Sequence, residues 1–218
     1  MRDPFFPRRR VLAASIVGSA ALTLPTALRG LAAAALAPTP QQTEGPFYPL
    51  SYPADSDNDL VHVAGHAEPA KGTMTRVAGR ILDPGGRPVS GARVEIWQCD
   101  VNGRYHNVRD GDAGRPRDEN FQGFGQTVTD SNGGYRFLTI RPVPYTGRTP
   151  HIHFAVAAPG QRRFITQMYV AGEPQNERDA VLLGVHDPAA RARLIVPLQP
   201  APELGHDALA AAFDIVLG

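Results

Sequence analysis

Short runs of alternating apolar residues, separated by Gly- and Pro-containing turns, follow one another from about residue 75 onward. A period of two is typical of strands with one buried face, and turns such as Asp83-Pro-Gly-Gly86 reverse the chain between them. The runs that predict strands are 75–82, 92–98, 125–129, 135–139, 151–157 and 164–169, with closing strands at 195–198 and 212–217. This pattern predicts an all-β fold, a β-sandwich of mostly antiparallel strands with long loops.

Three other segments complete the predicted organisation. Residues 187–193 begin with a capping Asp followed by Pro and good helix formers, so we expect one short helix there. Residues 38–74 are rich in Pro, Asp and Gly, which predicts an extended N-terminal arm over a sandwich domain formed by residues 75–218. The loop 107–120 is long and charged, and its sequence fits a solvated excursion as well as a lid.

The charge balance narrows the class of partner. The chain has 22 Lys and Arg against 21 Asp and Glu, a net charge of +1, and its charges are interspersed. Nucleic acid is therefore not an expected partner, and a small molecule is favoured. With 42% hydrophobic residues, the chain is ample for one domain with a proper core.

Residues 1–37 have the order of an export signal. The segment Pro7-Arg-Arg-Arg-Val-Leu12 leads into an apolar run at 11–24, and small residues follow at 31–37. The adjacent arginines resemble a twin-arginine signal, whereas Pro25 and Arg29 interrupt the run before it reaches the length of a membrane span. We expect an exported protein, periplasmic or extracellular, that meets a membrane only during export.

Four ligand-capable side chains, those of Tyr105, Tyr145, His151 and His153, predict a metal site. The two histidines are two residues apart in a predicted strand, so the pleat directs both imidazoles to one face. Two neutral imidazoles with two phenolates form a hard, anionic ligand set that suits Fe(III) better than zinc. Taken alone, a His-x-His pair is more often two buried structural histidines, and no carboxylate follows it as a cupin-type site would require.

Several segments together resemble one enzyme family. They are Thr43-Glu-Gly-Pro-Phe-Tyr-Pro49, Trp97-Gln-Cys-Asp-Val-Asn-Gly-Arg-Tyr105, Phe121-Gln-Gly-Phe-Gly125, Tyr145-Thr-Gly-Arg-Thr-Pro-His-Ile-His153 and Thr166-Gln-Met-Tyr169. In this order they resemble the intradiol ring-cleavage dioxygenases, particularly the protocatechuate 3,4-dioxygenase branch. The likeness runs from about Thr43 nearly to the end of the sequence. Any one segment would be unspecific, but the ordered set is distinctive.

The resemblance implies a reaction and a set of roles. A non-haem Fe(III) would be bound by Tyr105, Tyr145, His151 and His153, and O2 would cleave a catechol ring between its hydroxylated carbons to give a cis,cis-muconate-type diacid. Tyr145 would leave the metal when the diol binds. Arg148 would stabilise charge on the substrate ring, and Gln167 would lie near the substrate and oxygen pocket. The implied substrate contacts are Gly45, Pro46, Tyr48 and Trp97.

The sequence also keeps alternatives open. Arg148 alone would more often be a solvated charge, Gln167 could be a strand side chain bonded to backbone, and Trp97 could be a packed aromatic. The segments 77–96 and 129–137 also resemble transthyretin-like and carboxypeptidase-regulatory modules, which bind without catalysing. The Tyr145 to His151 segment is shorter than in the protocatechuate enzymes, which implies a more open pocket and leaves the catechol unnamed. One chain holds every ligand, so a homo-oligomer would suffice.

Overall fold

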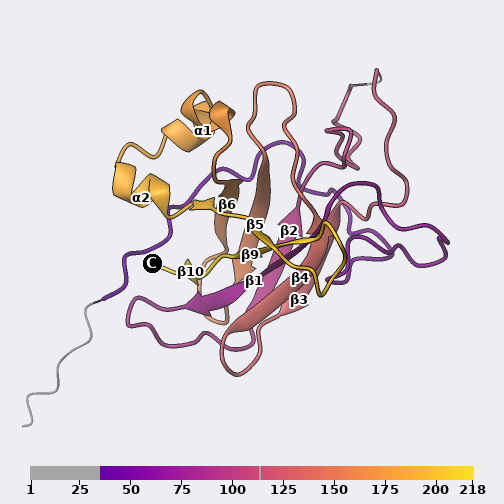
Figure 1. The fold of residues 1–218 in the computed structure, drawn as a ribbon. Coiled ribbons are helices and arrows are strands. Elements are labelled where there is room, and N and C mark those ends of the chain that lie inside the picture. Colours follow the sequence, from indigo (N-terminus) through magenta and orange to yellow (C-terminus); the bar gives the residue numbers. More distant parts are fainter. Residues whose placement is uncertain (1–34, 113) are drawn as a thin grey trace, which may run out of the picture. The chain divides into compact units, whose positions relative to one another are not determined.

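The computed structural model describes residues 35–112 and 114–218 (Figure 1). Most of the segment 1–37, which predicts an export signal, lies outside the described residues. In the part of the chain that the structure describes, no helix is long and apolar enough to cross a membrane.

Two five-stranded sheets make up the fold (Figure 1). The first has the order β10-β1-β9-β8, with β4 also paired to β1, and the second has the order β3-β2-β5-β6-β7. The strands are β1 (Met74–Leu82), β2 (Arg93–Trp97), β3 (Phe124–Val128), β4 (Gly134–Ile140), β5 (His151–Ala157), β6 (Phe164–Val170), β7 (Ile195–Val196), β8 (Gln199–Pro200), β9 (Leu209–Ala212) and β10 (Ile215–Val216). Five strand pairs are antiparallel and three, β1–β9, β1–β10 and β6–β7, are parallel. The predicted sandwich of mostly antiparallel strands is confirmed.

The C-terminal strands differ from the sequence prediction. The six longer strands form within one residue of their expected bounds, but the predicted strand 195–198 is reduced to β7, and the predicted strand 212–217 is wrong. It is split at Phe213 and Asp214 into the end of β9 and β10. The Phe213 carbonyl accepts a hydrogen bond from the Tyr135 hydroxyl at 2.5 Å, and the Asp214 carboxylate accepts one from Arg80 N at 2.8 Å. Contacts to other strands therefore replace regular pairing there.

The predicted short helix is present, and two helical turns were missed. Helix α2 (Pro188–Ala192) has Asp187 as its N-cap, and the side chain of Asp187 accepts hydrogen bonds from two backbone amides. A 3₁₀ turn, η1 (Pro174–Glu177), and a four-residue helix, α1 (Ala180–Leu183), precede it. Both are too short to show a helical period in the sequence. Figure 1 shows α1 and α2 near β6, and Tyr169 on β6 donates its amide to the Leu194 carbonyl just after α2.

The second sheet buries both of its faces, and this arrangement positions the site. Its inner face packs on the first sheet through residues such as Ile96, Ile152 and Phe154. Its outer face is buried in a second, smaller cluster around Trp97, which includes Tyr105 and side chains of the arm. Strand β5 is consequently buried at nearly every position. The outer face of this sheet is shielded from solvent by side chains of the arm and of the loop after β2, such as Phe47, Tyr48 and Tyr105.

The arm runs first beside β10 and then beside β6 before it covers this outer face. Residues 35–73 contain no helix and only one isolated bridge, between Asp59 and Leu138. Thr39 donates its amide to the Val216 carbonyl on β10 at 3.0 Å, and Gln42 donates its amide to the Ile165 carbonyl on β6 at 2.8 Å. The arm is therefore fixed to the second sheet directly before Thr43.

Candidate metal centre

Strand register brings three of the predicted site residues into one row. Trp97 on β2 is paired with His153 on β5, and His153 is paired with Gln167 on β6. The Trp97 and His153 rings stack with 4.8 Å between their centroids. Trp97 is buried on the outer face of the sheet, so it forms a wall of the site and not part of the core between the sheets.

The two imidazoles converge, as their spacing on one strand predicts. Their Nε2 atoms lie 3.1 Å apart. His151 Nδ1 donates to the Thr149 carbonyl at 2.6 Å, which leaves the lone pair of His151 Nε2 free for a ligand. Burial, reinforced by the charge of Arg148, lowers the pKa of His151 to about 3, and burial also holds the pKa of His153 well below its usual value. Both rings are therefore neutral, the form that binds metals.

The two tyrosines approach the histidines from separate loops. The Tyr105 ring is edge-on to the Tyr145 ring at 5.3 Å, and the Tyr145 and His151 ring centroids are 5.5 Å apart. Tyr105 is buried and its hydroxyl has no hydrogen-bond partner, an arrangement that costs free energy unless another group is bound there. Burial raises the pKa of Tyr105 well above its usual value and raises the pKa of Tyr145 as well.

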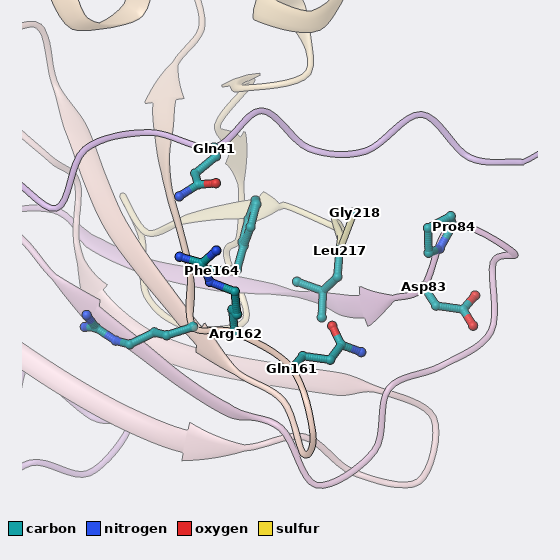
Figure 2. Close-up of a pocket in the computed structure, with 9 residues that line it drawn as sticks. Gln41, Asp83, Pro84, Gln161, Arg162, Phe164, Leu217 and Gly218 are labelled. Carbon is teal, nitrogen blue, oxygen red and sulfur yellow. The ribbon is translucent and has the colours of Figure 1, made fainter.

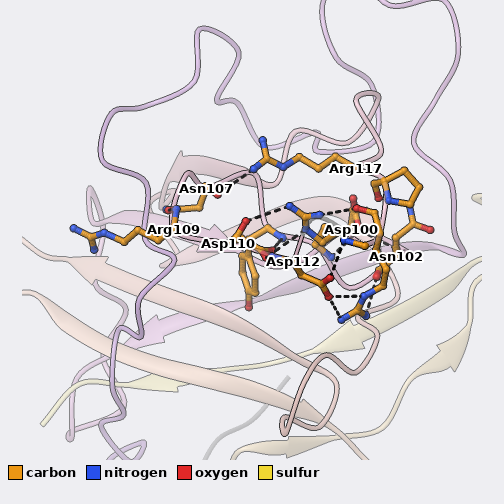
Figure 3. Close-up of polar contacts among 12 residues, drawn as sticks. Asp100, Asn102, Asn107, Arg109, Asp110, Asp112 and Arg117 are labelled. Carbon is orange, nitrogen blue, oxygen red and sulfur yellow. Dashed lines mark hydrogen bonds and ion pairs between the residues drawn. The ribbon is translucent and has the colours of Figure 1, made fainter.

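A dense polar network around Asp100 and Asp110 (Figure 3) holds the backbone of Tyr105. Asp100 accepts hydrogen bonds from the backbone amides of Asn102, Arg104 and Asp118 at 2.8–2.9 Å. Asp110 accepts the Tyr105 amide at 2.6 Å and forms an ion pair with Arg104 at 3.3 Å, with both side chains less than a tenth exposed. The loop 107–120, which the sequence left as either a solvated excursion or a lid, is therefore tied through Asp110 and Asp118 to the residues before it that carry Tyr105.

A tight turn places Arg148 beside Tyr145. The Arg148 amide donates to the Tyr145 carbonyl at 2.8 Å, and Gly147 adopts a φ of 75° in the left-handed region. The Arg148 Nη1 atom lies 3.5 Å from the Tyr145 hydroxyl oxygen. The shortness of this segment thus brings a permanent positive charge to the edge of the ligand set.

The Arg148 guanidinium is fixed on its other sides as well. Its Nη2 donates to Gln167 Oε1 at 2.8 Å and lies 3.4 Å from the Tyr169 hydroxyl. Its Nε donates to Asp179 Oδ2 at 2.8 Å. Arg148 is accordingly half-buried in a defined orientation and is not the solvated charge that a loop arginine usually is.

Asp179 was not among the residues singled out from the sequence. Its fully buried carboxylate binds Arg148 and the Thr149 amide on one side and caps α1 through the amides of Val181 and Leu182 on the other. The available signal was an Asp directly before a short apolar run, which is typical of a helix N-cap. That signal predicts the cap and gives no indication of the arginine partner.

Gln167 connects the arginine to the arm. Its Oε1 accepts from Arg148, while its Nε2 donates to the Thr43 carbonyl at 2.9 Å. One residue earlier, Gln42 Oε1 accepts a hydrogen bond from the Tyr169 hydroxyl at 2.5 Å. Gln167 is therefore bonded to backbone, as one interpretation of the sequence had it, and also contacts the arginine beside the candidate ligands.

The arm residues named from the sequence differ in where they lie. Gly45 has a φ of 73°, and a Cβ atom there would lie 3.3 Å from His153 Cε1. Phe47, which the sequence reading did not single out, stacks on Tyr105 at 4.5 Å. Pro46 is exposed, and the Tyr48 hydroxyl is directed to Glu95 at 2.9 Å. Gly45 and Phe47 are thus the arm residues closest to the four candidate ligands.

This donor set fits a trivalent metal. Two imidazole nitrogens that contact only each other and two phenols converge here, and the unpartnered Tyr105 oxygen would gain a partner from a cation. Among residues 35–112 and 114–218, no three His, Cys, Asp or Glu side chains gather as a metal site. The four candidate ligands are two histidines and two tyrosines, so they are not a cluster of that kind. Phenolate oxygens are the hard, anionic ligands that suit ferric iron.

Cavities adjoin this centre on two sides. One of about 270 Å³ is lined by Tyr145, Gly147, Arg148 and Thr149, and another of about 270 Å³ is lined by Phe47, Trp97 and Tyr105, among other residues. A larger cavity of about 640 Å³ lies elsewhere, between the turn after β1, the turn before β6 and the C-terminal residues (Figure 2). None of the predicted site residues lines that larger cavity.

A family model described as Dioxygenase matches residues 43–218. The chain is 42% identical over 171 residues to the protocatechuate 3,4-dioxygenase beta chain of Burkholderia cepacia, covering 74% of this chain and 71% of that protein. The chain belongs to the intradiol ring-cleavage dioxygenases. It is also 34% identical to the hydroxyquinol 1,2-dioxygenase of Corynebacterium glutamicum, over 68% of this chain and 54% of that longer protein.

Solved structures show the same fold. The dioxygenase domain of a dioxygenase and carbohydrate-binding protein fusion from Streptomyces sp. SirexAA-E aligns with a TM-score of 0.63 at 30% identity, covering 83% of this chain and 98% of that one. A hydroxyquinol 1,2-dioxygenase from Pseudomonas putida DLL-E4 aligns with a TM-score of 0.63 at 26% identity, over 82% of this chain and 66% of that one. These matches favour an intradiol dioxygenase over the transthyretin-like binding module that parts of the sequence resemble.

Proposed function

We propose that this intradiol dioxygenase holds a non-haem Fe(III) through Tyr105, Tyr145, His151 and His153 and cleaves a catechol-type ring with O2. The observation that carries the assignment is the convergence of two imidazole Nε2 atoms, 3.1 Å apart and with no partner but each other in the described structure, with an unpartnered buried phenol. When bound, the ferric ion would supply Lewis acidity, keeping both phenols ionised at neutral pH and activating the chelated diol toward O2.

The two tyrosines are suited to different roles. Tyr105 is buried in a loop fixed by Asp100 and Asp110, so we assign it to permanent ligation. Tyr145 is half-buried and faces a cavity, and its oxygen lies 3.5 Å from Arg148 Nη1. We expect the Tyr145 phenolate to take one hydroxyl proton from the incoming diol and to turn toward Arg148.

Arg148 is the residue we expect to stabilise negative charge on the substrate ring. Its position is set by Asp179 and Gln167 before any substrate arrives, so no reorganisation is needed during the reaction. Gly45, Pro46, Tyr48 and Trp97 remain the proposed substrate contacts, with Gln167 beside them. Phe47, stacked on Tyr105, joins this group.

The catechol itself is a proposal at the level of class. The relatives are named for protocatechuate, hydroxyquinol and catechol, and the tight turn from Tyr145 to Arg148 is bordered by a cavity of about 270 Å³. We propose a catechol-type diol with room for a substituent at this turn. We further propose export through the segment 1–37 and a homo-oligomer as the assembly; fractionation of the source cells and light scattering of the purified protein test these two points.

Colour and oxygen uptake test the proposed function. Purified or ferric-reconstituted protein should be wine-red through tyrosinate-to-iron charge transfer and should consume O2 with catechols above an iron blank. Tyr145→Phe and His153→Ala should abolish that uptake while the fold is kept, and His206→Ala, at a fully exposed histidine, serves as the matched control. Protein that stays colourless and iron-free after reconstitution would refute the metal assignment, and wild-type turnover in either variant would refute the ligand assignment.

A further inference from the structure

Glu95 is a buried carboxylate that the proposed reaction does not use. It lies on β2 two residues before Trp97, so both side chains point to the outer face of the second sheet. Its side chain is 1% exposed. A buried carboxylate is strongly unfavourable unless it is paired and hydrogen-bonded, so the partners of Glu95 indicate what it contributes.

Four donors surround the Glu95 carboxylate, and two of them come from the arm. Oε2 accepts from the Tyr48 hydroxyl at 2.9 Å and lies 3.2 Å from Arg163 Nη2. Oε1 accepts from the Tyr52 hydroxyl at 3.0 Å and lies 2.9 Å from Arg93 Nε. Burial, together with the hydrogen bonds to Tyr52 and Glu95, raises the pKa of Tyr48, which therefore remains a proton donor. Glu95 thus joins two arm phenols to two basic side chains of the sandwich.

Arg163, directly before β6, also links Glu95 to the arm. Its guanidinium carbon lies 4.4 Å from the centre of the Tyr48 ring, in a cation–π contact, and its Nη1 pairs with Glu44. Tyr48 also packs edge-on against Trp97 at 5.0 Å, and Tyr52 stacks on Phe124 at 5.1 Å. Within residues 48–52, the hydrogen bonds to the rest of the described chain are those of Tyr48 and Tyr52 to Glu95 and that of the Asn107 side chain to the Tyr48 carbonyl.

The segment between these attachments covers the candidate centre. Upstream, the Thr43 carbonyl is bonded to Gln167, and downstream, Tyr48 and Tyr52 are bonded to Glu95. Between them Gly45 lies against His153 and Phe47 stacks on Tyr105. Because the covering residues have a fixed point on each side, loss of the downstream point would free Phe47 and the proposed substrate contacts near it.

We infer that Glu95 is a positioning residue that holds arm residues 44–52 closed over the candidate centre and so sets the affinity for substrate. Glu95 contacts none of the four candidate metal ligands and acts through Tyr48, Tyr52 and the Arg163 side chain that pairs with Glu44. This inference rests on the proposed function for its effect on substrate. Its structural part, the attachment of the arm, does not depend on turnover.

The test compares Glu95→Gln with Arg93→Gln in the full-length, iron-loaded protein. Glutamine has nearly the same shape, but its amide nitrogen replaces one acceptor oxygen and would face a donor. Arg93 also binds Glu95 yet forms no hydrogen bond or ion pair with residues 35–73 in the described structure, so its loss is the matched control. Amide hydrogen exchange of peptides covering residues 41–53 is the primary measurement, with peptides from β6 as the internal reference.

In Glu95→Gln we expect exchange in residues 44–52 to quicken by at least about tenfold, with β6 unchanged, as expected for loss of hydrogen bonds to a charged group. With catechol as the probe, KM should rise by about tenfold while kcat and the visible spectrum without substrate stay near wild type. The double variant Tyr48→Phe, Tyr52→Phe keeps Glu95 and its arginines and should reproduce the faster exchange in residues 44–52, which is the only measurement it is used for because Tyr48 is itself a proposed substrate contact. This variant serves as the test if Glu95→Gln does not fold.

Unchanged arm exchange in a folded variant would overturn the inference, as would faster exchange of equal size in Arg93→Gln. A fall in kcat at unchanged KM would assign Glu95 another role and also overturn it. Absence of turnover in the wild type with every catechol-type diol tried, catechol, protocatechuate and hydroxyquinol included, would refute the proposed function, and the exchange comparison would still decide whether Glu95 fastens the arm.

Discussion

Replacing Asp179 by asparagine isolates the pairing that orients Arg148. In the wild type, Oδ1 accepts the amides of Val181 and Leu182, while Oδ2 accepts Arg148 Nε at 2.8 Å and the Thr149 amide at 3.0 Å. Asparagine keeps one acceptor oxygen, which can still cap α1. Its amide nitrogen then faces the Arg148 and Thr149 donors, so the variant loses the arginine contact with little effect on the helix cap.

The cost follows from burial and charge. Breaking a buried ion pair by removing one partner costs about 3–5 kcal/mol. The Asp179 side chain is fully buried, but that of Arg148 is 15% exposed and keeps its contact with Gln167, so the lower end, about 3 kcal/mol, is appropriate. With a urea dependence of about 2 kcal/mol per molar, the unfolding midpoint should fall by roughly 1.5 M.

Equilibrium urea unfolding followed by tryptophan fluorescence measures this shift, since Trp97 is the only tryptophan. Asp187→Asn is the matched control, because Asp187 caps α2 through two amides and has no arginine partner in the described structure. We expect that control to lose less than about 1 kcal/mol. A loss for Asp179→Asn within about 0.5 kcal/mol of the control's loss would refute the argument that the buried pairing orients Arg148.

The same comparison has a defined pH dependence. Burial alone would raise the pKa of Asp179, but hydrogen bonds from the Leu182 amide, Arg148 and the Thr149 amide lower it overall. A carboxyl with a depressed folded-state pKa contributes stability above its unfolded pKa, about 3.9, and loses that contribution as the pH falls through the folded-state value. The stability difference between wild type and Asp179→Asn should be constant above about pH 5 and shrink below about pH 4. A difference that grows on acidification would contradict this assignment.

Three further substitutions have clear expected outcomes. Gly79→Ala places a Cβ 2.0 Å from the Phe213 carbonyl oxygen. It should lower the free energy of unfolding in urea by at least about 3 kcal/mol, and a loss below about 1 kcal/mol would contradict this close approach of Gly79 to Phe213. Gly45→Val forces a branched residue to a φ of 73° against His153 and should lower both thermal stability and iron retention on dialysis. Tyr105→Phe removes the unpartnered hydroxyl, so the iron-free protein should be as stable as wild type or more so, while ferric binding measured by visible absorption is lost.

The sequence was sufficient where a short-range pattern decides the structure. Alternating apolar residues located the six longer strands, and the spacing of His151 and His153 correctly predicted that their rings share a face. The ordered motifs predicted the family. The cap at Asp187 located α2 for the same reason, because capping depends only on neighbouring residues.

What the sequence could not supply depends on residues far apart along the chain. Phe213 leaves its predicted strand because Tyr135, 78 positions earlier, donates to its carbonyl. Glu95 and Tyr48 are separated by 47 positions, and neither lies in a motif that indicates the other. The fixed conformation of the loop around Tyr105 likewise results from several side chains that fold back on it, which composition cannot distinguish from a solvated loop.

The bond between Thr39 and Val216 has a consequence for the order of events during synthesis. The arm is synthesised before either sheet. Its partner Val216, however, is in place only once β9 and β10 have been translated and have paired with β1. The start of the arm around Thr39 therefore cannot be fixed until β10 has been made and paired. A C-terminal truncation upstream of β10 should therefore make the residues around Thr39 more sensitive to proteases, while the segment 43–52 keeps its attachments to β2 and β6.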